Sequence, residues 1–158
     1  MVAQAGKRET DLAVIRAYKI LQAGSWATAS VIDEITLDYA RRHRRRHRFN
    51  TASGAEILLD LPEAIHIRDG DAMGLEDGTC ISVRAAPEEL LEITTPDAHS
   101  LTRLAWHLGN RHLAVQILPD RLRILQDHVI AEMILRLGGN VSEIAAPFDP
   151  ETGAYHHE

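Results

Sequence analysis

The stretch "LTRLAWHLGNRHLAVQIL", residues 101–118, decides how the second half of the chain folds. Its apolar residues recur at intervals of three and four, the spacing of a buried helix face: Leu101, Leu104, Ala105 and Leu108. Gly109 or Asn110 can then take the left-handed conformation that ends a helix. Because "LAVQIL" reads as a strand, the stretch predicts a helix, a sharp reversal and a strand.

Similar signals lie on both sides of this stretch. "LLEITT" (residues 90–95) predicts a strand, after which Asp97 can cap the helix. "RLRIL" (121–125) predicts another strand, and Asp127 can cap a second helix that ends at two glycines before the strand "NVSEIAA" (140–146). The order β-α-β-β-α-β predicts a ferredoxin-like domain, in which both helices pack on one face of an antiparallel sheet.

The first half of the chain reads as a small all-β unit. Ile35, Leu37 and Tyr39 alternate with polar residues, and "AEILLDLP" (55–62) predicts a short strand stopped by Pro62. Two Asp-Gly turn signals then precede the strand "CISVRAA" (80–86). We therefore expect an α+β protein with an N-terminal β domain at residues 1–88, a ferredoxin-like domain at 89–148 and a mobile tail at 149–158.

The composition of the 158 residues, 45% hydrophobic and 25% charged, is typical of a soluble globular protein. Cys80 is the sole cysteine, so one chain can form neither an internal disulfide nor a thiolate zinc cluster. No stretch approaches the ~20 apolar residues of a membrane span, and the first residues lack the apolar core of a secretory signal. We expect a cytoplasmic protein without a membrane partner.

The charge is strongly polarised. The run "RRHRRRHR", from Arg41 to Arg48, holds six of the 17 basic residues, and without it 11 Lys and Arg remain against 23 Asp and Glu. Dense arginine suits a nucleic-acid backbone, which makes a nucleic-acid-binding module the alternative function. Phe49 is the only aromatic residue beside the run, however, and the body is acidic. We expect a solvated face that meets an acidic protein partner, and no nucleic acid.

Histidine is the residue type that points to chemistry, since nine are present. His112 lies just after the predicted reversal, where an ordinary surface histidine is the plain alternative. His128 opens the second helix, where the helix dipole favours a neutral imidazole, although polar first-turn residues are common. His156 and His157 end the sequence as two nitrogen donors suited to Ni, Cu or Zn, or as a remnant of expression design.

Motifs of enzymes are missing from the sequence. It contains no H-E-x-x-H, no G-x-S-x-G and no glycine-rich phosphate loop, and Cys80 has no context that suggests a nucleophile. We therefore expect no catalysis. A metal-dependent enzyme is a further alternative, which turnover on a panel of esters and phosphates would reveal.

Several segments together resemble the UreE family of urease accessory proteins, the nickel metallochaperones. They are "RRHRRRHRF" (41–49), "LAWHLGNRHLAVQI" (104–117), "DRLRILQDHVIAEM" (120–133) and "APFDPETGAYHH" (146–157). The resemblance implies an N-terminal domain that engages protein partners and a ferredoxin-like domain that binds metal and dimerises. It also implies a protein that captures Ni(II) at a homodimer interface and delivers it for assembly of the urease active site.

The same resemblance implies the site and the partners. His112 matches the histidine that binds the metal together with its symmetry mate, and His156 and His157 match tail positions that supply further ligands. Gln126 stands where some members have another histidine, so His128 is a peripheral site. The implied partners are a second copy of the chain, the urease accessory GTPase UreG and the complex of urease apoprotein with its accessory proteins. Zn(II) and Cu(II) are the competing ions.

Overall fold

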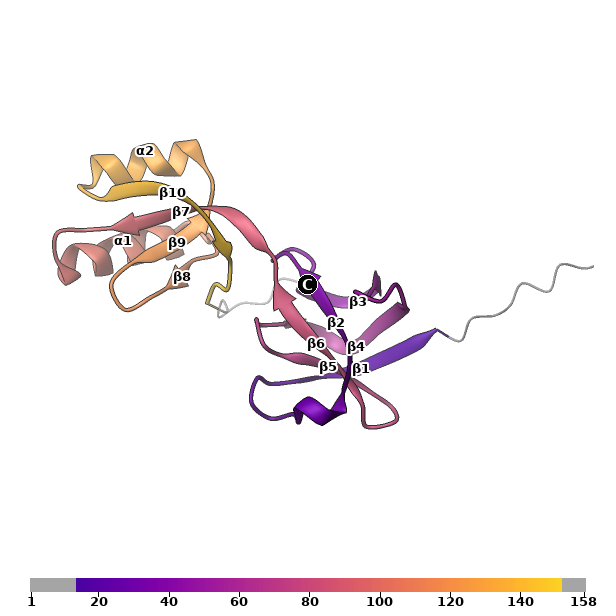
Figure 1. The fold of residues 1–158 in the computed structure, drawn as a ribbon. Coiled ribbons are helices and arrows are strands. Elements are labelled where there is room, and N and C mark those ends of the chain that lie inside the picture. Colours follow the sequence, from indigo (N-terminus) through magenta and orange to yellow (C-terminus); the bar gives the residue numbers. More distant parts are fainter. Residues whose placement is uncertain (1–13, 152–158) are drawn as a thin grey trace, which may run out of the picture.

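The computed structural model describes residues 14–151, which form two sheet-based units that meet near residue 86 (Figure 1). We call residues 14–86 the N-terminal unit and residues 87–151 the C-terminal unit. The first contains only strands and one short 3-10 helix, and the second carries both α-helices. The expected α+β class, with the helices confined to the second half, is confirmed.

The N-terminal unit is a curled six-stranded sheet with the order β2-β6-β5-β1-β4-β3. Its elements are β1 (Ile15–Leu21), η1 (Thr28–Ser30), β2 (Val31–Leu37), β3 (His43–Asn50), β4 (Glu56–His66), β5 (Ala72–Leu75) and β6 (Cys80–Ala85). Alternate residues of these strands point inward and form one core that includes Ile35, Leu37, Ile57 and Leu59. Gly70 and Gly78 have positive φ values at the two predicted Asp-Gly turns.

The prediction that Pro62 stops its strand is wrong, because β4 continues through it to His66. β1 pairs with β4 only as far as Leu59. On the other side the register of β3 shifts between Arg44 and Arg46, opposite residues 60–65 of β4. Pro62 lies within this irregular interval, where its missing N–H costs no regular ladder hydrogen bond.

The C-terminal unit is a four-stranded sheet with the order β10-β7-β9-β8, in which all neighbours are antiparallel. Its elements are β7 (Pro87–Thr94), α1 (Ala98–Asn110), β8 (Gln116–Ile117), β9 (Leu122–Leu125), α2 (His128–Arg136) and β10 (Asn140–Pro147). Asp97 and Asp127 cap the two helices as predicted, since Asp97 accepts the backbone N–H of Ser100 and Asp127 accepts those of Val129 and Ile130.

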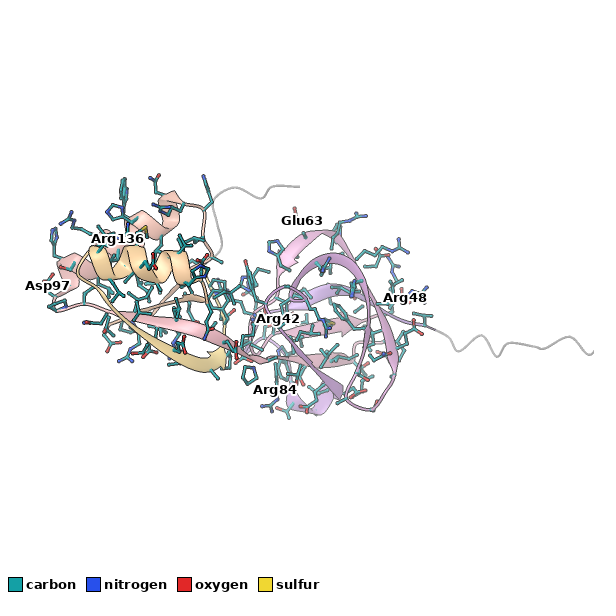
Figure 2. The ribbon with its side chains drawn as sticks, turned by 90° about the horizontal axis from the view of Figure 1, so that it is seen from above. Arg42, Arg48, Glu63, Arg84, Asp97 and Arg136 are labelled. Carbon is teal, nitrogen blue, oxygen red and sulfur yellow. The ribbon has the colours of Figure 1, made fainter. Side chains whose placement is uncertain are left out.

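Both helices cover the same face of this sheet, as Figure 2 shows from above. Leu104 and Leu108 of α1 share one core with Ile130 and Ile134 of α2 and with alternate residues of β7 and β9. On the opposite face Glu92 forms ion pairs with Arg121 and Arg123. One face is thus apolar and covered by helices, and the other carries charge.

The strand expected for "LAVQIL" is shorter than predicted. Only Gln116 and Ile117 pair with β9, whereas Leu113 and Val115 pack into the core before the strand begins. Neither helix found between residues 14 and 151 has the length and apolar character that crossing a bilayer requires.

Candidate metal site at the end of helix α1

His112 adopts an unusual backbone conformation. Its φ is +58°, and it is the only residue other than glycine with a positive φ among residues 14–151. A side chain in this left-handed region costs roughly 1–2 kcal/mol, because Cβ approaches the following carbonyl oxygen. Strain of this kind at a histidine singles out the position as a candidate functional site.

The conformation ends α1 through a pair of reverse hydrogen bonds. The N–H of His112 donates to the carbonyl of Gly109 (3.0 Å), and the N–H of Leu113 donates to the carbonyl of Leu108 (3.3 Å). This is the Schellman arrangement, in which the residue after the C-cap is left-handed. The prediction that Gly109 or Asn110 takes the left-handed role is therefore wrong, since both belong to the helix and the turn falls on His112 itself.

Helix α2 ends in the same way and supplies an internal comparison. Gly138 stands where α1 has His112, with a φ of +86°, and its N–H donates to the carbonyl of Leu135 (3.1 Å). The N–H of Gly139 donates to the carbonyl of Ile134 (3.0 Å). Glycine is the usual residue at this position because it bears no Cβ. The chain thus uses glycine at one helix end and a strained histidine at the other.

We predict that replacing His112 with glycine raises the free energy of unfolding by about 0.5–1 kcal/mol, because the turn is kept and the left-handed strain is removed. The matched substitution Gly138→His should lower it by a similar amount. Urea denaturation of both variants against the unchanged protein measures the two effects. A destabilised His112→Gly variant would show that the imidazole holds the helix end through contacts of its own.

The described residues include His112 and His128 but no complete metal site. His112 is exposed, and so is His128, the first residue of α2. His156 and His157 lie outside the described residues. Within residues 14–151 no three His, Cys, Asp or Glu side chains come together in a way that can hold a metal ion. A site at His112 therefore needs ligands from residues 152–158 or from a second chain.

The basic run was expected to form a solvated face, but one of its arginines is not exposed. Residues 43–48 are exposed on β3, an edge strand, but Arg42 is completely buried. Figure 2 places Arg42 where the two units meet and Arg48 at the far side of the N-terminal unit. Phe49 is buried as well and offers no stacking face. Nothing in the letters of the run distinguishes Arg42 from its five neighbouring arginines, so sequence reasoning missed it.

The segment that follows β10 is also held in place. Phe148 is fully buried, the N–H of Asp149 donates to the Gln116 side chain (3.2 Å), and the N–H of Glu151 donates to the carbonyl of Val115 (2.9 Å). Asp149 and Glu151, which open the tail expected to be mobile, are therefore hydrogen-bonded to the C-terminal unit. The chain enters residues 152–158 beside Val115, three positions from His112.

Comparison with known families assigns both halves of the chain. Residues 13–86 match the family model of the N-terminal domain of the UreE urease accessory protein, and residues 88–158 match the model of its C-terminal domain.

Individual relatives agree with these models. A urease accessory protein UreE from Bradyrhizobium sp. (strain ORS 278) is 54% identical over 142 residues, which cover 90% of this chain and 67% of the relative. One from Beijerinckia indica subsp. indica is 48% identical over 151 residues, covering 92% and 87%. One from Rhodobacter capsulatus is 51% identical over 140 residues, covering 89% and 86%. The likeness extends through both units.

Proposed function

Since the chain belongs to the UreE family of urease accessory proteins, we propose that it is a nickel-binding metallochaperone for urease maturation. Two chains form a homodimer, and His112 of each chain captures Ni(II) at the shared interface. Family membership supports the role in urease maturation. The nickel ion, the dimer and the residues of the site are the parts that we propose.

The observation that carries the site is the left-handed His112. Glycine serves the same turn at the end of α2, so the fold itself does not require histidine at this position. An imidazole held there is exposed, borne by a rigid helix end and able to offer a neutral nitrogen to a divalent ion. The strain is consistent with a residue kept for binding.

The need for a second chain follows because His112 belongs to no group of three possible metal-binding side chains within residues 14–151. One imidazole is a poor site, but a two-fold axis brings a second, identical imidazole without any further ligand in the sequence. Six of the nine large hydrophobic side chains that are exposed among the described residues belong to the C-terminal unit, which offers apolar surface for dimerisation there. They are Trp106, Ile117, Leu125, Val129, Leu135 and Leu137.

The tail histidines supply further nitrogen ligands in this proposal. Val115 is three residues from His112, a span of at most ~10 Å, and six residues from Glu151 to His157 can extend over ~20 Å. We call residues 152–158 the C-terminal arm. Because Glu151 is bonded to Val115, this arm is long enough for His156 and His157 to reach His112. His128 is a peripheral ligand at most.

The remaining parts of the proposal concern delivery. The N-terminal β domain, residues 1–88, engages protein partners, and the domain at 89–148 binds metal, with its strand order supporting the ferredoxin-like assignment. An open set of imidazoles allows exchange of the ion to the accessory GTPase UreG and the urease apoprotein complex in the cytoplasm. Zn(II) and Cu(II) compete for nitrogen ligands, since Cu(II) binds such sites more tightly than Ni(II).

Nickel stoichiometry tests the proposal directly. We predict one tightly bound Ni(II) per two chains in equilibrium dialysis, because a site on the two-fold axis is shared. A chain ended after Ala154 should keep this ratio and bind more weakly. One tight ion per chain in the shortened protein would contradict the shared site.

A further inference from the structure

The side chain of Arg42 joins the two units of the molecule. Its guanidinium donates to the carbonyls of Leu37 (3.2 Å) and Ile67 (3.1 Å) in the N-terminal unit. It also donates to the carbonyl of Phe148 and to the carboxylate of Asp149 (3.3 Å), which belong to the C-terminal unit. All of these contacts are made by a side chain with no solvent exposure.

Aromatic packing surrounds this guanidinium. The ring of Tyr39 lies edge-on to Phe148, with centroids 5.3 Å apart, and edge-on to His66 at 5.4 Å. His66 Nε2 is 3.4 Å from Arg42 Nη1 and 3.5 Å from the Asp149 carboxylate. Arg68 also pairs with that carboxylate at 3.6 Å. The junction is therefore a closed cluster and not a single surface ion pair.

The segment at residues 148–151 of the C-terminal unit is hydrogen-bonded to both units. Phe148 and Asp149 are bonded to Arg42 on one side, and Asp149 and Glu151 are bonded to Gln116 and Val115 on the other. Phe148, Asp149 and Glu151 are thus hydrogen-bonded to other parts of the structure before the chain continues into residue 152. The fixed end lies next to the segment that carries His112.

We propose that Arg42 is a positioning residue for the C-terminal arm: by clamping residues 148–149 against the N-terminal unit it fixes where the arm starts relative to His112. This inference rests on the proposed function for its consequence, since the arm delivers His156 and His157 to the ion. The clamp itself is a property of the metal-free protein.

Stability alone does not account for an arginine at this place. The electrostatic attraction within a buried ion pair is about as large as the desolvation penalty of the two charges. An apolar residue of similar volume often stabilises a fold equally well. A guanidinium adds direction, because its five N–H donors lie in a fixed plane. Arg42 uses them on three carbonyls and one carboxylate from both units, which specifies a single arrangement of the segment.

Amide hydrogen exchange of the metal-free protein tests the clamp. In Arg42→Gln we expect the amide of Glu151 to exchange at least about tenfold faster, while the amides of β6 stay protected. Asp149→Asn, which keeps the size of the side chain, should also make the amide of Glu151 exchange faster. Arg45→Gln on the exposed strand β3 is the matched control and should change nothing. Unchanged exchange at Glu151 in both clamp variants overturns the proposal.

Nickel affinity then separates positioning from general damage. Arg42→Gln should weaken Ni(II) binding about tenfold in the full chain, because the arm ligands lose effective concentration. In a chain ended after Ala154 the same substitution should have no effect on affinity. An equal loss in both backgrounds overturns the positioning role. If the wild-type protein binds no nickel at His112, the proposed function fails. The hydrogen-exchange result still shows whether Arg42 holds residues 148–149 in place.

Discussion

Replacing His112 with alanine lowers the affinity for Ni(II) by at least about 100-fold. Loss of a residue that merely supports a ligand costs ~10- to 100-fold, and loss of the ligand itself, twice in a symmetric dimer, costs more. Isothermal titration with Ni(II) measures the change. Alanine also occupies the left-handed position at a cost similar to that of histidine, so the helix end and the fold are preserved.

His128→Ala is the matched control, since it removes another exposed histidine from the same unit. It should weaken binding by less than about tenfold, as expected of a peripheral ligand. His112→Gly, which relieves the strain, should lose nickel as completely as His112→Ala does. A tight nickel site that survives in either His112 variant would show that the ion is bound elsewhere.

Acidification from pH 7 to pH 4.5 removes about 2–3 kcal/mol of the free energy of unfolding through His66 alone. Burial lowers the pKa of His66 from 6.5 to about 4, and the charges of Arg68, Arg42 and His43 act in the same direction. The unfolded chain therefore binds a proton on this ring below pH 6.5, whereas the folded protein resists it until about pH 4. The contribution of His66 to stability is full above pH 6.5 and is lost as the pH falls toward 4.

Asp149 beside this ring acts in the opposite sense. Burial raises the pKa of its carboxyl, while Arg68 and Arg42 oppose the rise. Its protonation therefore favours the folded state in acid. The pH dependence of the free energy of unfolding of the wild-type protein thus combines the effects of Asp149 and His66. His66→Gln, which keeps a polar side chain of similar length, should reduce the loss of stability between pH 7 and 4.5 by about 2–3 kcal/mol. Urea denaturation at several pH values measures the difference.

His47→Gln, which removes an exposed histidine of β3 whose charge is not among the causes of the His66 shift, is the comparison protein and should leave the contribution of His66 in place. An identical pH dependence in wild type and His66→Gln would contradict the buried neutral imidazole.

Much of the C-terminal unit could be predicted from the sequence, because its signals are local. The spacing of Leu104 and Leu108 and the caps Asp97 and Asp127 act within a few residues, and the structure agrees with them. The end of α1 was placed at the wrong residue for a physical reason. Propensity favours glycine or asparagine in the left-handed position, and His112 overrides that preference.

Features that depend on contacts across the chain were not predictable. Arg42 meets Asp149, 107 positions away, and no local pattern shows which arginine of the run makes that contact. β4 passes through Pro62 because of the register of its neighbours, which the sequence of β4 does not contain. For the candidate site, the sequence pointed to the helix end and to His112, but the further ligands that we propose are not among the described residues of one chain.

The most direct test of the central claim is anomalous diffraction at the nickel edge from crystals of the Ni(II)-loaded protein. We expect a peak on a two-fold axis, bonded to a ring nitrogen of His112 from each of two chains. A peak bonded to other residues, with the two His112 rings far apart in every assembly of the crystal, would contradict it.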